Sequence, residues 1–495
     1  MIVFFRRAAL LALLGFLGAG TVTAQTAPAP DGTSGEEITF DEALRIGLAR
    51  NTSLRQAANV AEARGFDVSR VRANFLPDLS ASIRPTQRFG LAFDQTTGQL
   101  DQETTQSLDA NLSANLNVFN GFRDQASLDQ SVLEREASEY SLGRAQQDVL
   151  FNVANQFLQV MLNKQLVLIQ EENLEADRSQ LDQIEQLVEA GVRARADVLQ
   201  QQALVAQREL TLLQAESDLE VSQTRLVQIL QLDPFGNYTF VAPSLEAAPL
   251  QPGAYDLEAL LTAALDRRDD LRAQQLQIEA AEAGIRVAKG GYYPTVNLFA
   301  GYGSGYSSSA TRTVGGPPLQ IPVTNSDGTP ILLGGEPLTF NEQLPREDTP
   351  FGDQFFTDNR GGSFGLSINI PIFDRFATRA QVQQAELTAA NERIQLENLR
   401  QDVALQVRQG YLDYQNAAKR LDVTARQVAA ASAALDAEQE RYDLGVSTLT
   451  ELTQARALLI EAQSSRAQAV AQFVFQSKLI DYATGALDPT APLFE

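Results

Sequence analysis

Residues 107–122, SLDANLSANLNVFNGF, carry the pattern that decides the fold. Apolar and polar side chains alternate from Ser107 to Phe119, and a stretch with no Pro and a single Gly, 122–189, follows directly. Alternation with a period of two predicts a β-strand with one apolar and one polar face, whereas a long stretch free of Pro suits a helix. The sequence therefore predicts a long strand that leads straight into a long helix.

Three other stretches alternate in the same way as 107–119. The apolar positions of the four stretches are Leu79, Ala81, Ile83, Leu108, Ala110, Leu112, Ala114, Leu116, Val118, Val296, Leu298, Ala300, Tyr302, Phe364, Leu366, Ile368, Ile370 and Ile372. Such strands are typical of a transmembrane β-barrel, in which apolar side chains face lipid and polar side chains face the lumen. An ordinary half-buried antiparallel sheet has the same pattern. The strands alone leave both interpretations open.

The chain is a tandem duplication, which decides the architecture. A shift of 217 residues places FLPDLS (75–80) on YYPTVN (292–297), and a shift of 254 places NVFNGF (117–122) on PIFDRF (371–376). The shift of 254 exceeds the shift of 217 by 37 residues, so the second half carries an insertion of that length between its two aligned blocks. The insertion falls in 303–361, which reads as a long polar loop rich in Gly and Pro.

Apolar residues recur every seven positions along the predicted helices. The series are Val153, Val160, Val167, Leu174, Leu181 and Val188; their repeat mates Val407, Tyr414, Leu421, Val428, Leu435 and Tyr442; and Val198, Val205, Leu212, Leu219 and Leu226 on a returning helix. A sustained seven-residue repeat predicts helices that supercoil around one another. At about 1.5 Å per residue, a stretch of this length forms a rod of roughly 100 Å, too long for a globular core.

Each half is expected to consist of a strand hairpin followed by a helix hairpin. We expect these units: a first structural repeat at 38–250 with a strand hairpin at 79–119 and a helix hairpin at 120–232, and a second at 251–487 with a strand hairpin at 295–373, the loop 303–361 and a helix hairpin at 374–484. Gly191 and Gly445 stand where the long helices end, and Gly suits the left-handed conformation of a helix C-terminus.

The N-terminus has the features of a secretory signal peptide at 1–24. Arg6 and Arg7 precede a short apolar run, and small residues around Ala24 form a cleavage site. Residues 25–37 are expected to form a flexible leader, and 488–495 a C-terminal tail. No run of 18 apolar residues follows the signal, so export would end in the periplasm, outside the cell, or in the outer membrane as a barrel.

Composition excludes several classes of function. The chain has a net charge of −23 and contains no Cys, His or Trp. Without His or Cys, common acid–base groups and metal ligands are missing, so we expect neither an enzyme nor a metal or cofactor site. The acidic balance argues against nucleic-acid binding and fits a surface or lumen that prefers cations.

Four strands are too few to close a barrel, for which about eight are needed. An open sheet in lipid would leave backbone groups without hydrogen bonds, so a membrane-spanning sheet requires several chains to pool their strands. Two chains would supply eight strands and three chains twelve, and the pattern does not choose between them. Aromatic residues cluster where strands meet helices, namely Phe75, Phe119, Tyr292, Tyr293 and Phe373. They fit either an aromatic girdle at the membrane interface or ordinary packing at the junction.

The ordered double set of motifs resembles the TolC-like outer membrane factors. The first half carries FLPDL at 75–79, NVFNGF at 117–122 and EAGVRARADVL at 189–199. The second half carries NIPIFD at 369–374 and YDLGVSTLTEL at 442–452. No single motif is specific for this family, but the order of the motifs over about residues 38–486 is specific for it.

The resemblance implies an α+β membrane protein built from a tandem repeat, with four transmembrane β-strands and long coiled-coil α-helices per chain. A homotrimer would form a twelve-stranded β-barrel in the outer membrane of a Gram-negative bacterium, continuous with a periplasmic α-helical barrel. The implied function is the exit duct of a tripartite efflux or type I secretion system. Its implied partners are outer-membrane lipid, a periplasmic adaptor and an inner-membrane pump of the RND or ABC type.

The resemblance also implies a periplasmic gate at the helix-hairpin tips. The turns that would face the adaptor are Gly191, Val192, Gly445 and Val446. Asp197 and Tyr442 match positions that link neighbouring coiled coils in the closed state, whereas Ala196 and Ser447 depart from a second link. Glu451 matches a first acidic ring in the pore, and Gln454 stands where a second acid is usual.

Each gate candidate also has a plain structural interpretation. Thr448 and Glu451 fit a capping box, Asp197 lies where an acid favours a helix N-terminus, and Tyr442 continues the heptad series. Among whole-protein alternatives, a periplasmic or secreted coiled-coil scaffold remains, although four unbroken apolar strand faces argue against a soluble sheet. A passive porin is disfavoured because it has no heptad rods. The exported substrate is not specified by the sequence.

Overall fold

The computed structural model describes residues 36–94, 99–241, 253–314, 320–341 and 346–487. The expected signal peptide at 1–24, leader residues 25–35 and the tail at 488–495 lie outside these ranges. None of the helices in the described ranges is both long enough and apolar enough to cross a membrane.

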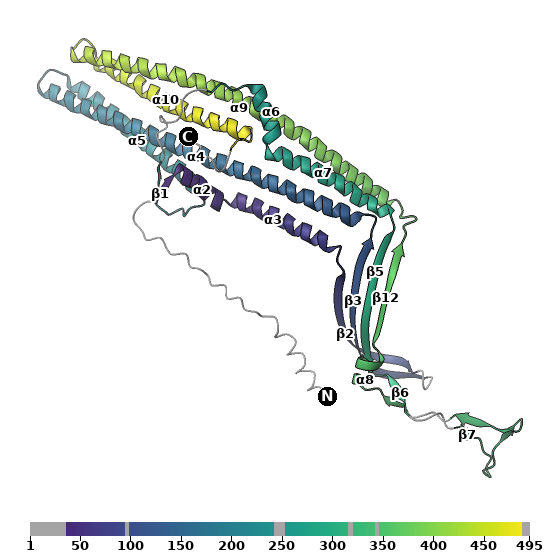
Figure 1. Cartoon of the computed structure of the whole chain (residues 1–495). Coiled ribbons are helices and arrows are strands. Elements are labelled where there is room, and N and C mark those ends of the chain that lie inside the picture. Colours follow the sequence, from purple (N-terminus) through teal and green to yellow (C-terminus); the bar gives the residue numbers. More distant parts are fainter. Residues whose placement is uncertain (1–35, 95–98, 242–252, 315–319, 342–345, 488–495) are drawn as a thin grey trace.

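Four antiparallel strands form one sheet in the order β12-β5-β3-β2 (Figure 1). They are β2 (Asp78–Asp94), β3 (Gln99–Phe119), β5 (Thr295–Ser307) and β12 (Gly361–Asn369). The strand hairpins of both halves therefore join through β3 and β5, as the duplication favours. Among the described strands, the outer strands β2 and β12 each have a neighbour on one side only.

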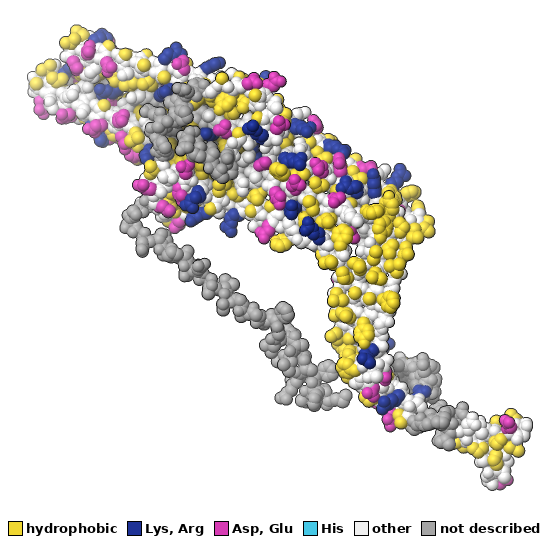
Figure 2. Space-filling view, viewed as in Figure 1, with side chains coloured by type: hydrophobic (Ala, Val, Ile, Leu, Met, Phe, Trp, Pro, Cys, Tyr) yellow, Lys and Arg dark blue, Asp and Glu magenta, His cyan; other side chains and the backbone are white. Residues whose placement is uncertain are grey.

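The strand register collects the alternating apolar residues on one face of the sheet. One row across the sheet runs Leu79, Ala114, Ala300, Phe364, and the next row toward the other face runs Ser80, Ser113, Gly301, Ser363. The apolar face is uncovered: Phe364 is 88% exposed, and Figure 2 shows a hydrophobic surface over the strands. Because burying apolar area is strongly favourable, this face needs an apolar environment outside the chain.

Two helices of equal length run from the sheet to the far end of the molecule. They are α4 (Arg123–Glu189) and α9 (Ala377–Asp443), each of 67 residues, or about 100 Å at 1.5 Å per residue. Helices α3 (Thr52–Ala73) and α5 (Arg195–Leu230) pack along α4, whereas α7 (Asp269–Lys289) and α10 (Leu449–Ala483) contact both α4 and α9. Figure 1 shows both helix hairpins ending side by side, far from the sheet. The α+β fold class predicted from the sequence is confirmed.

A belt of short elements packs around the middle of the long helices (Figure 1). It comprises β1 (Glu36–Thr39), α2 (Phe40–Arg50), β4 (Tyr238–Val241) and α6 (Leu257–Arg267), with β1 and β4 paired in parallel. The ring of Phe157 on α4 is fully buried, with edge-on contacts to Phe40 and Phe240 at centroid distances of 5.1 and 6.2 Å. Residues 36 and 37 are part of β1, so the flexible leader expected at 25–37 does not include them.

The insertion at 303–361 is not a loop throughout. Strand β5 extends to Ser307, and short ladders follow in the described part of the insertion. They pair β6 (Thr311–Thr313) with β11 (Arg346–Asp348), β7 (Gln320–Pro322) with β10 (Thr339–Asn341), and β8 (Leu332–Leu333) with β9 (Glu336–Pro337), before α8 (Phe351–Asp353) and η3 (Gln354–Asp358). Backbone pairing between distant parts of the insertion orders a stretch whose composition alone predicts a loop.

Strand and helix join through two consecutive left-handed residues in each half. Gly121 and Phe122 have φ of 71° and 63°, and their repeat mates Arg375 and Phe376 have φ of 56° and 63°. A Cβ on Gly121 would lie 2.5 Å from the carbonyl oxygen of Gly290. Position 375 carries an Arg in the same conformation, so close packing, more than backbone conformation, requires Gly at 121.

We predict that Gly121→Ala destabilises the protein by about 1–3 kcal/mol, because the added methyl group forces apart the junction with Gly290. The matched control is Arg375→Ala, which keeps a side chain at the equivalent left-handed position. Thermal unfolding followed by circular dichroism measures both. Equal transition temperatures for the two variants would contradict the role of close packing.

Candidate functional site at the helix-hairpin tips

Two nearly identical turns connect the helices of the two hairpins. Gly191 and Gly445 have φ of 77° and 73°, and the amide groups of the following residues donate to the carbonyls of Leu187 and Arg441 at 2.9 Å. These bonds end α4 and α9 in the way that left-handed Gly residues end helices generally. The following residues, Val192 and Val446, are 69% and 66% exposed, so each turn presents an apolar side chain to the outside.

Tyr442 is the centre of a small core at the tips. It is 5% exposed and packs in one cluster with Ile184 from α4 and Leu449 and Leu452 from α10. The guanidinium of Arg193 lies 4.4 Å from the ring centroid, a cation–π distance. Among the described residues, nothing forms a hydrogen bond with the buried Tyr442 hydroxyl.

Asp197 lies near Tyr442 without being hydrogen-bonded to it within the described chain. Burial raises the pKa of the Tyr442 hydroxyl; the charge of Arg193 opposes this rise, and the charge of Asp197 adds to it. The structure thus brings together the two residues that the resemblance links, and it adds Arg193. Asp197 is half-buried in the first turn of α5, which also fits its plain role beside a helix N-terminus.

Glu451 forms the predicted capping box with Thr448 at the start of α10. Its Oε2 accepts from the Thr448 amide at 2.8 Å and from the Ser447 hydroxyl at 2.9 Å. These bonds, together with the bond from the Thr448 hydroxyl, lower the pKa of the exposed Glu451 carboxyl. The carboxylate therefore stays charged at a lower pH than an ordinary Glu side chain does. Ser447 also donates to Glu438, and Gln454 is exposed one turn further along α10.

A buried charge cluster that sequence reasoning missed joins the two hairpins above the tips. Asp177 of α4 is 0% exposed; its Oδ2 lies 3.2 Å from Arg208 Nε on α5, and its Oδ1 lies 2.9 Å from Arg456 Nη1 on α10. The Gln201 side chain, also fully buried, donates to the Asp177 carbonyl at 3.0 Å. One carboxylate therefore connects the α4–α5 hairpin to α10 of the other hairpin.

The heptad series held a signal for this cluster. The apolar stripe at Val160, Val167 and Leu174 is buried, but toward the tips the fully buried positions are Asp177 and Ile184, seven residues apart on a neighbouring stripe. A series chosen by apolar residues passes over a charged residue at a core position. Reading all positions with a period of seven, including polar ones, would have marked Asp177.

The junction aromatics lie at the border of sheet and helices. Phe75, Tyr292, Tyr293 and Phe373 are exposed, whereas Phe119 is half-buried and packs edge-on against Phe122 at 5.2 Å. The same pairing recurs in the second half between Phe373 and Phe376 at 5.6 Å. Phe122 and Phe376 are therefore members of this group that the sequence reading omitted.

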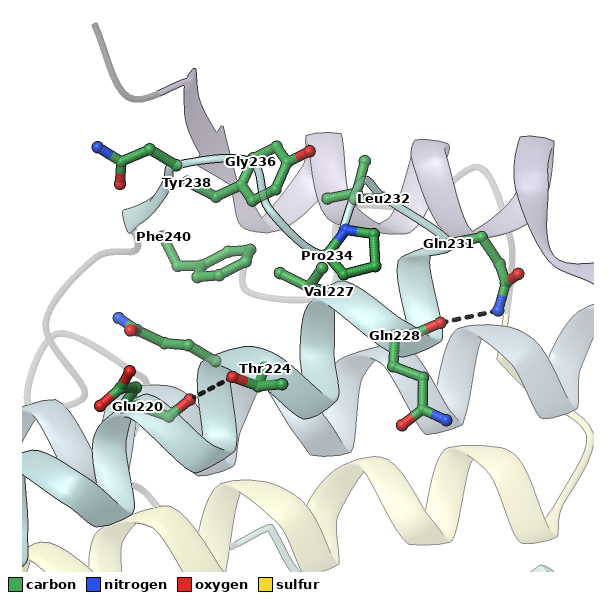
Figure 3. Close-up of a pocket in the computed structure, with 12 residues that line it drawn as sticks. Glu220, Thr224, Val227, Gln228, Gln231, Leu232, Pro234, Gly236, Tyr238 and Phe240 are labelled. Carbon is green, nitrogen blue, oxygen red and sulfur yellow. Dashed lines mark hydrogen bonds between the residues drawn. The ribbon is translucent and has the colours of Figure 1, made fainter. Parts of the chain in front are cut away.

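A cavity of about 750 Å³ opens in the belt, beside the C-terminus of α5 and β4 (Figure 3). Thr224, Val227 and Gln228 line one side, and Tyr238 and Phe240 of β4 line the other. The hydrogen bonds drawn in Figure 3 run from the Thr224 hydroxyl to the Glu220 carbonyl and from the side chain of Gln231, just after α5, to the Gln228 carbonyl. Among the described lining residues Glu220 is the one carboxylate, so these residues do not present a convergent catalytic set.

We predict that Asp177→Ala lowers the local opening free energy of the tip helices by about 2–4 kcal/mol, because it leaves two part-buried guanidinium groups without their buried carboxylate. The control is Arg178→Ala, which removes the neighbouring half-exposed pair with Glu209 between the same helices and is expected to cost only about 0–1 kcal/mol. Hydrogen exchange of α4, α5 and α10 measures both. Similar protection in the two variants would show that the cluster does not join the hairpins.

Comparison with known proteins gives a consistent result over nearly the whole chain. Protein CyaE of Bordetella pertussis is 24% identical over 453 residues, covering 91% of this chain and 85% of CyaE. Outer membrane protein TolC of Escherichia coli K12 is 24% identical over 451 residues, covering 88% of this chain and 80% of TolC. The crystal structure of the CmeC outer membrane channel of Campylobacter jejuni has the same fold, with a TM-score of 0.70 at 14% identity, over 94% of this chain and 92% of CmeC.

A family model adds the assignment. The model described as outer membrane efflux protein matches residues 44–231 and 260–486, which include all four strands of the sheet and both helix-hairpin tips. The chain therefore belongs to the outer membrane efflux protein family and serves as an outer-membrane exit duct for efflux or type I secretion.

Proposed function

We propose that three copies of this chain close into a twelve-stranded β-barrel in the outer membrane, continuous with a helical tube in the periplasm. The observation that carries the proposal is the four-stranded sheet with one uncovered apolar face and two unpaired edges, on β2 and β12. In lipid, backbone groups along such edges must be paired, and joining β12 of one chain to β2 of the next satisfies both.

The polar face of the sheet suits the lumen of this barrel. It carries Ser, Asn and Gly residues in successive rows, such as Ser80, Ser113, Gly301 and Ser363. Small polar side chains leave room for a water-filled passage, and the net charge of −23 favours cations along it. A barrel of twelve strands is wider than the smallest closed barrels, whose interiors side chains fill.

The tips are proposed to meet a periplasmic adaptor that connects the duct to an inner-membrane pump of the RND or ABC type. Support comes from the exposed apolar residues of the two turns, Val192 and Val446, together with Leu444, which is also exposed. Apolar side chains on a protruding tip are typical of a contact with another protein. Export through the signal peptide at 1–24, with cleavage after Ala24, would place the tips in the periplasm.

We further propose that Asp197, Tyr442, Glu451 and Gln454 form the closed gate at these tips. The Tyr442 hydroxyl, buried and without a partner in its own described chain, has its hydrogen-bonding capacity left for a neighbouring protomer. The charged Glu451 carboxylates of three chains would surround the pore and attract cations. Asp177, Arg208 and Arg456 would hold the two hairpins of each chain together on the side of the tips that faces the belt.

The trimer can be tested with disulfides, because the natural chain has no Cys. Ser82→Cys on β2 is combined with either Ser363→Cys or Ser367→Cys on β12, all on the polar face. Within one chain, β3 and β5 separate these positions by about 14 Å, too far for a disulfide. We expect covalent species of two and three chains after oxidation in outer membranes. Absence of linked chains for both pairs, or a ladder beyond three, would contradict the trimer; Ser82→Cys alone is the control.

The gate can be tested by single-channel conductance in planar lipid bilayers. The double variant Asp197→Ala with Tyr442→Phe is expected to raise the conductance of the closed duct, since it removes the link between neighbouring hairpins. Tyr442→Phe alone keeps the ring in the tip core and removes only the hydroxyl. It raises conductance if the hydroxyl bonds a neighbouring chain and leaves it unchanged if Tyr442 serves only in packing. No rise in the double variant would refute the gate, and Arg178→Ala is the control.

A further inference from the structure

One short segment of the insertion folds back onto the sheet. This segment, the collar, is Phe351–Asp358 and comprises α8 and η3. Figure 1 places α8 at the end of the strands remote from the long helices. Distant from it along the same insertion, the hairpin of β7 and β10 projects beyond the sheet (Figure 1).

The buried side chain of Gln354 fastens the collar to the exposed end of β5. Its Oε1 accepts from the Ser307 amide at 2.9 Å, and its Nε2 donates to the Ser307 carbonyl at 3.0 Å and to the Thr349 carbonyl at 2.7 Å. Asn359 donates in the same way to the Gly305 carbonyl at 2.7 Å. Strand β12 pairs with β5 only up to Gly303. Along the last residues of β5, the side-chain amides of Gln354 and Asn359 therefore take the place of the backbone hydrogen bonds of a neighbouring strand.

The collar places aromatic rings on the apolar face of the sheet. Tyr306 pairs across the strands with Leu108 and so continues the apolar rows, and its ring contacts Phe351 edge-on at 5.2 Å. Phe355 stacks on Phe351 at 5.2 Å, and Phe356 packs edge-on against both. Phe356 remains 62% exposed, so the cluster forms an aromatic rim at this end of the apolar face.

The distance between the aromatic rim at the collar and the aromatic residues at the junction with the helices matches the thickness of the apolar part of a bilayer. Ten residues of β5 separate Tyr306 from Val296, which pairs with Phe119 at the junction with the helices. At about 3.3 Å per residue this is roughly 33 Å along the strand, and the tilt of barrel strands reduces it to about 25 Å, the height of the apolar band of outer-membrane barrels. Charged side chains lie at the collar itself, where Asp353 of α8 pairs with Arg312 of β6 at 3.2 Å.

We propose that the collar is a membrane anchor that lies in the outer-leaflet interface, with Phe351, Phe355 and Phe356 at the boundary between acyl chains and headgroups. This rests on the proposed function, since the sheet must span the bilayer. Aromatic rings are favourable at that depth, because one side meets apolar chains and the other a polar region. The first half of the chain lacks the 37 inserted residues, and its described part contains no such element, so the anchor would occur once per chain.

The absence of Trp from the chain allows a direct test with single Trp probes. Three matched variants replace an exposed Phe: Phe356→Trp in the collar, Phe364→Trp in the middle of the apolar face and Phe340→Trp on β10. Each full-length protein is reconstituted in vesicles of lipids brominated near the headgroup or near the end of the acyl chain. Trp fluorescence quenching is then compared with quenching by aqueous iodide.

We expect Phe356→Trp to lose more fluorescence with shallow than with deep bromine and to emit at shorter wavelength than Phe340→Trp. Phe364→Trp should be quenched most by deep bromine, and Phe340→Trp only by iodide. If Phe356→Trp behaves like Phe340→Trp, the anchor is refuted while the barrel stands. If Phe364→Trp also escapes both bromolipids, the sheet does not span the bilayer and the proposed function fails. Adding Gln354→Ala to Phe356→Trp should abolish the shallow quenching, and unchanged quenching would contradict the fastening role of Gln354.

Discussion

The unpaired edges of one four-stranded sheet are the constraint on which the rest of the molecule depends. Strands β2 and β12 each lack a neighbour on one side, while the apolar face between them has no cover within the described chain. A soluble chain with such a sheet would aggregate through its edges. In lipid the same edges must be closed by further copies, because no water is available to the backbone. Membrane insertion and oligomerisation are therefore one requirement, and each of them is unfavourable without the other.

The helices meet a related difficulty at the other end of the molecule. Rods of about 100 Å have too little local contact to form one compact core, so successive parts of α4 are covered by different partners. Near the sheet these are α3 and α7; at the belt they include α2; toward the tips they are α5 and α10. Next to the small apolar core of the tips, where few elements remain, a buried ion cluster around Asp177 adds to apolar packing. Buried ion pairs add little net stability but demand a defined geometry, which suits a contact between two hairpins that must keep register.

Much of the fold was predictable because each local sequence pattern occurs in both halves of the repeat. The alternating residues of β3 and β12, the heptads of α4 and α9, and the turns at Gly191 and Gly445 all appear in both halves. The collar was not predictable, because its contacts join residues that are distant in the sequence. The seven-residue period marks Asp177 as a core position, but its partners Arg208 and Arg456 lie on other helices and could not be identified from the sequence. Gln354 in a polar insertion gives no local sign that its amide will pair with Ser307. Of the gate candidates, only the capping box of Thr448 and Glu451 is a local motif, and it forms as expected.

The places where the two halves differ have a physical meaning of their own. Where both halves carry the same chemistry, as at the paired rings of Phe119 with Phe122 and Phe373 with Phe376, the shared feature belongs to the architecture. Asp177 has Ala431 as its repeat mate, and Tyr442 has Val188. In the proposed trimer, the two dissimilar hairpins of each chain would make two kinds of contact between neighbouring coiled coils. One kind could then open while the other holds, which identical halves would not allow. The collar is a further difference between the halves, at the opposite end of the molecule, since it belongs to only one of the two strand hairpins.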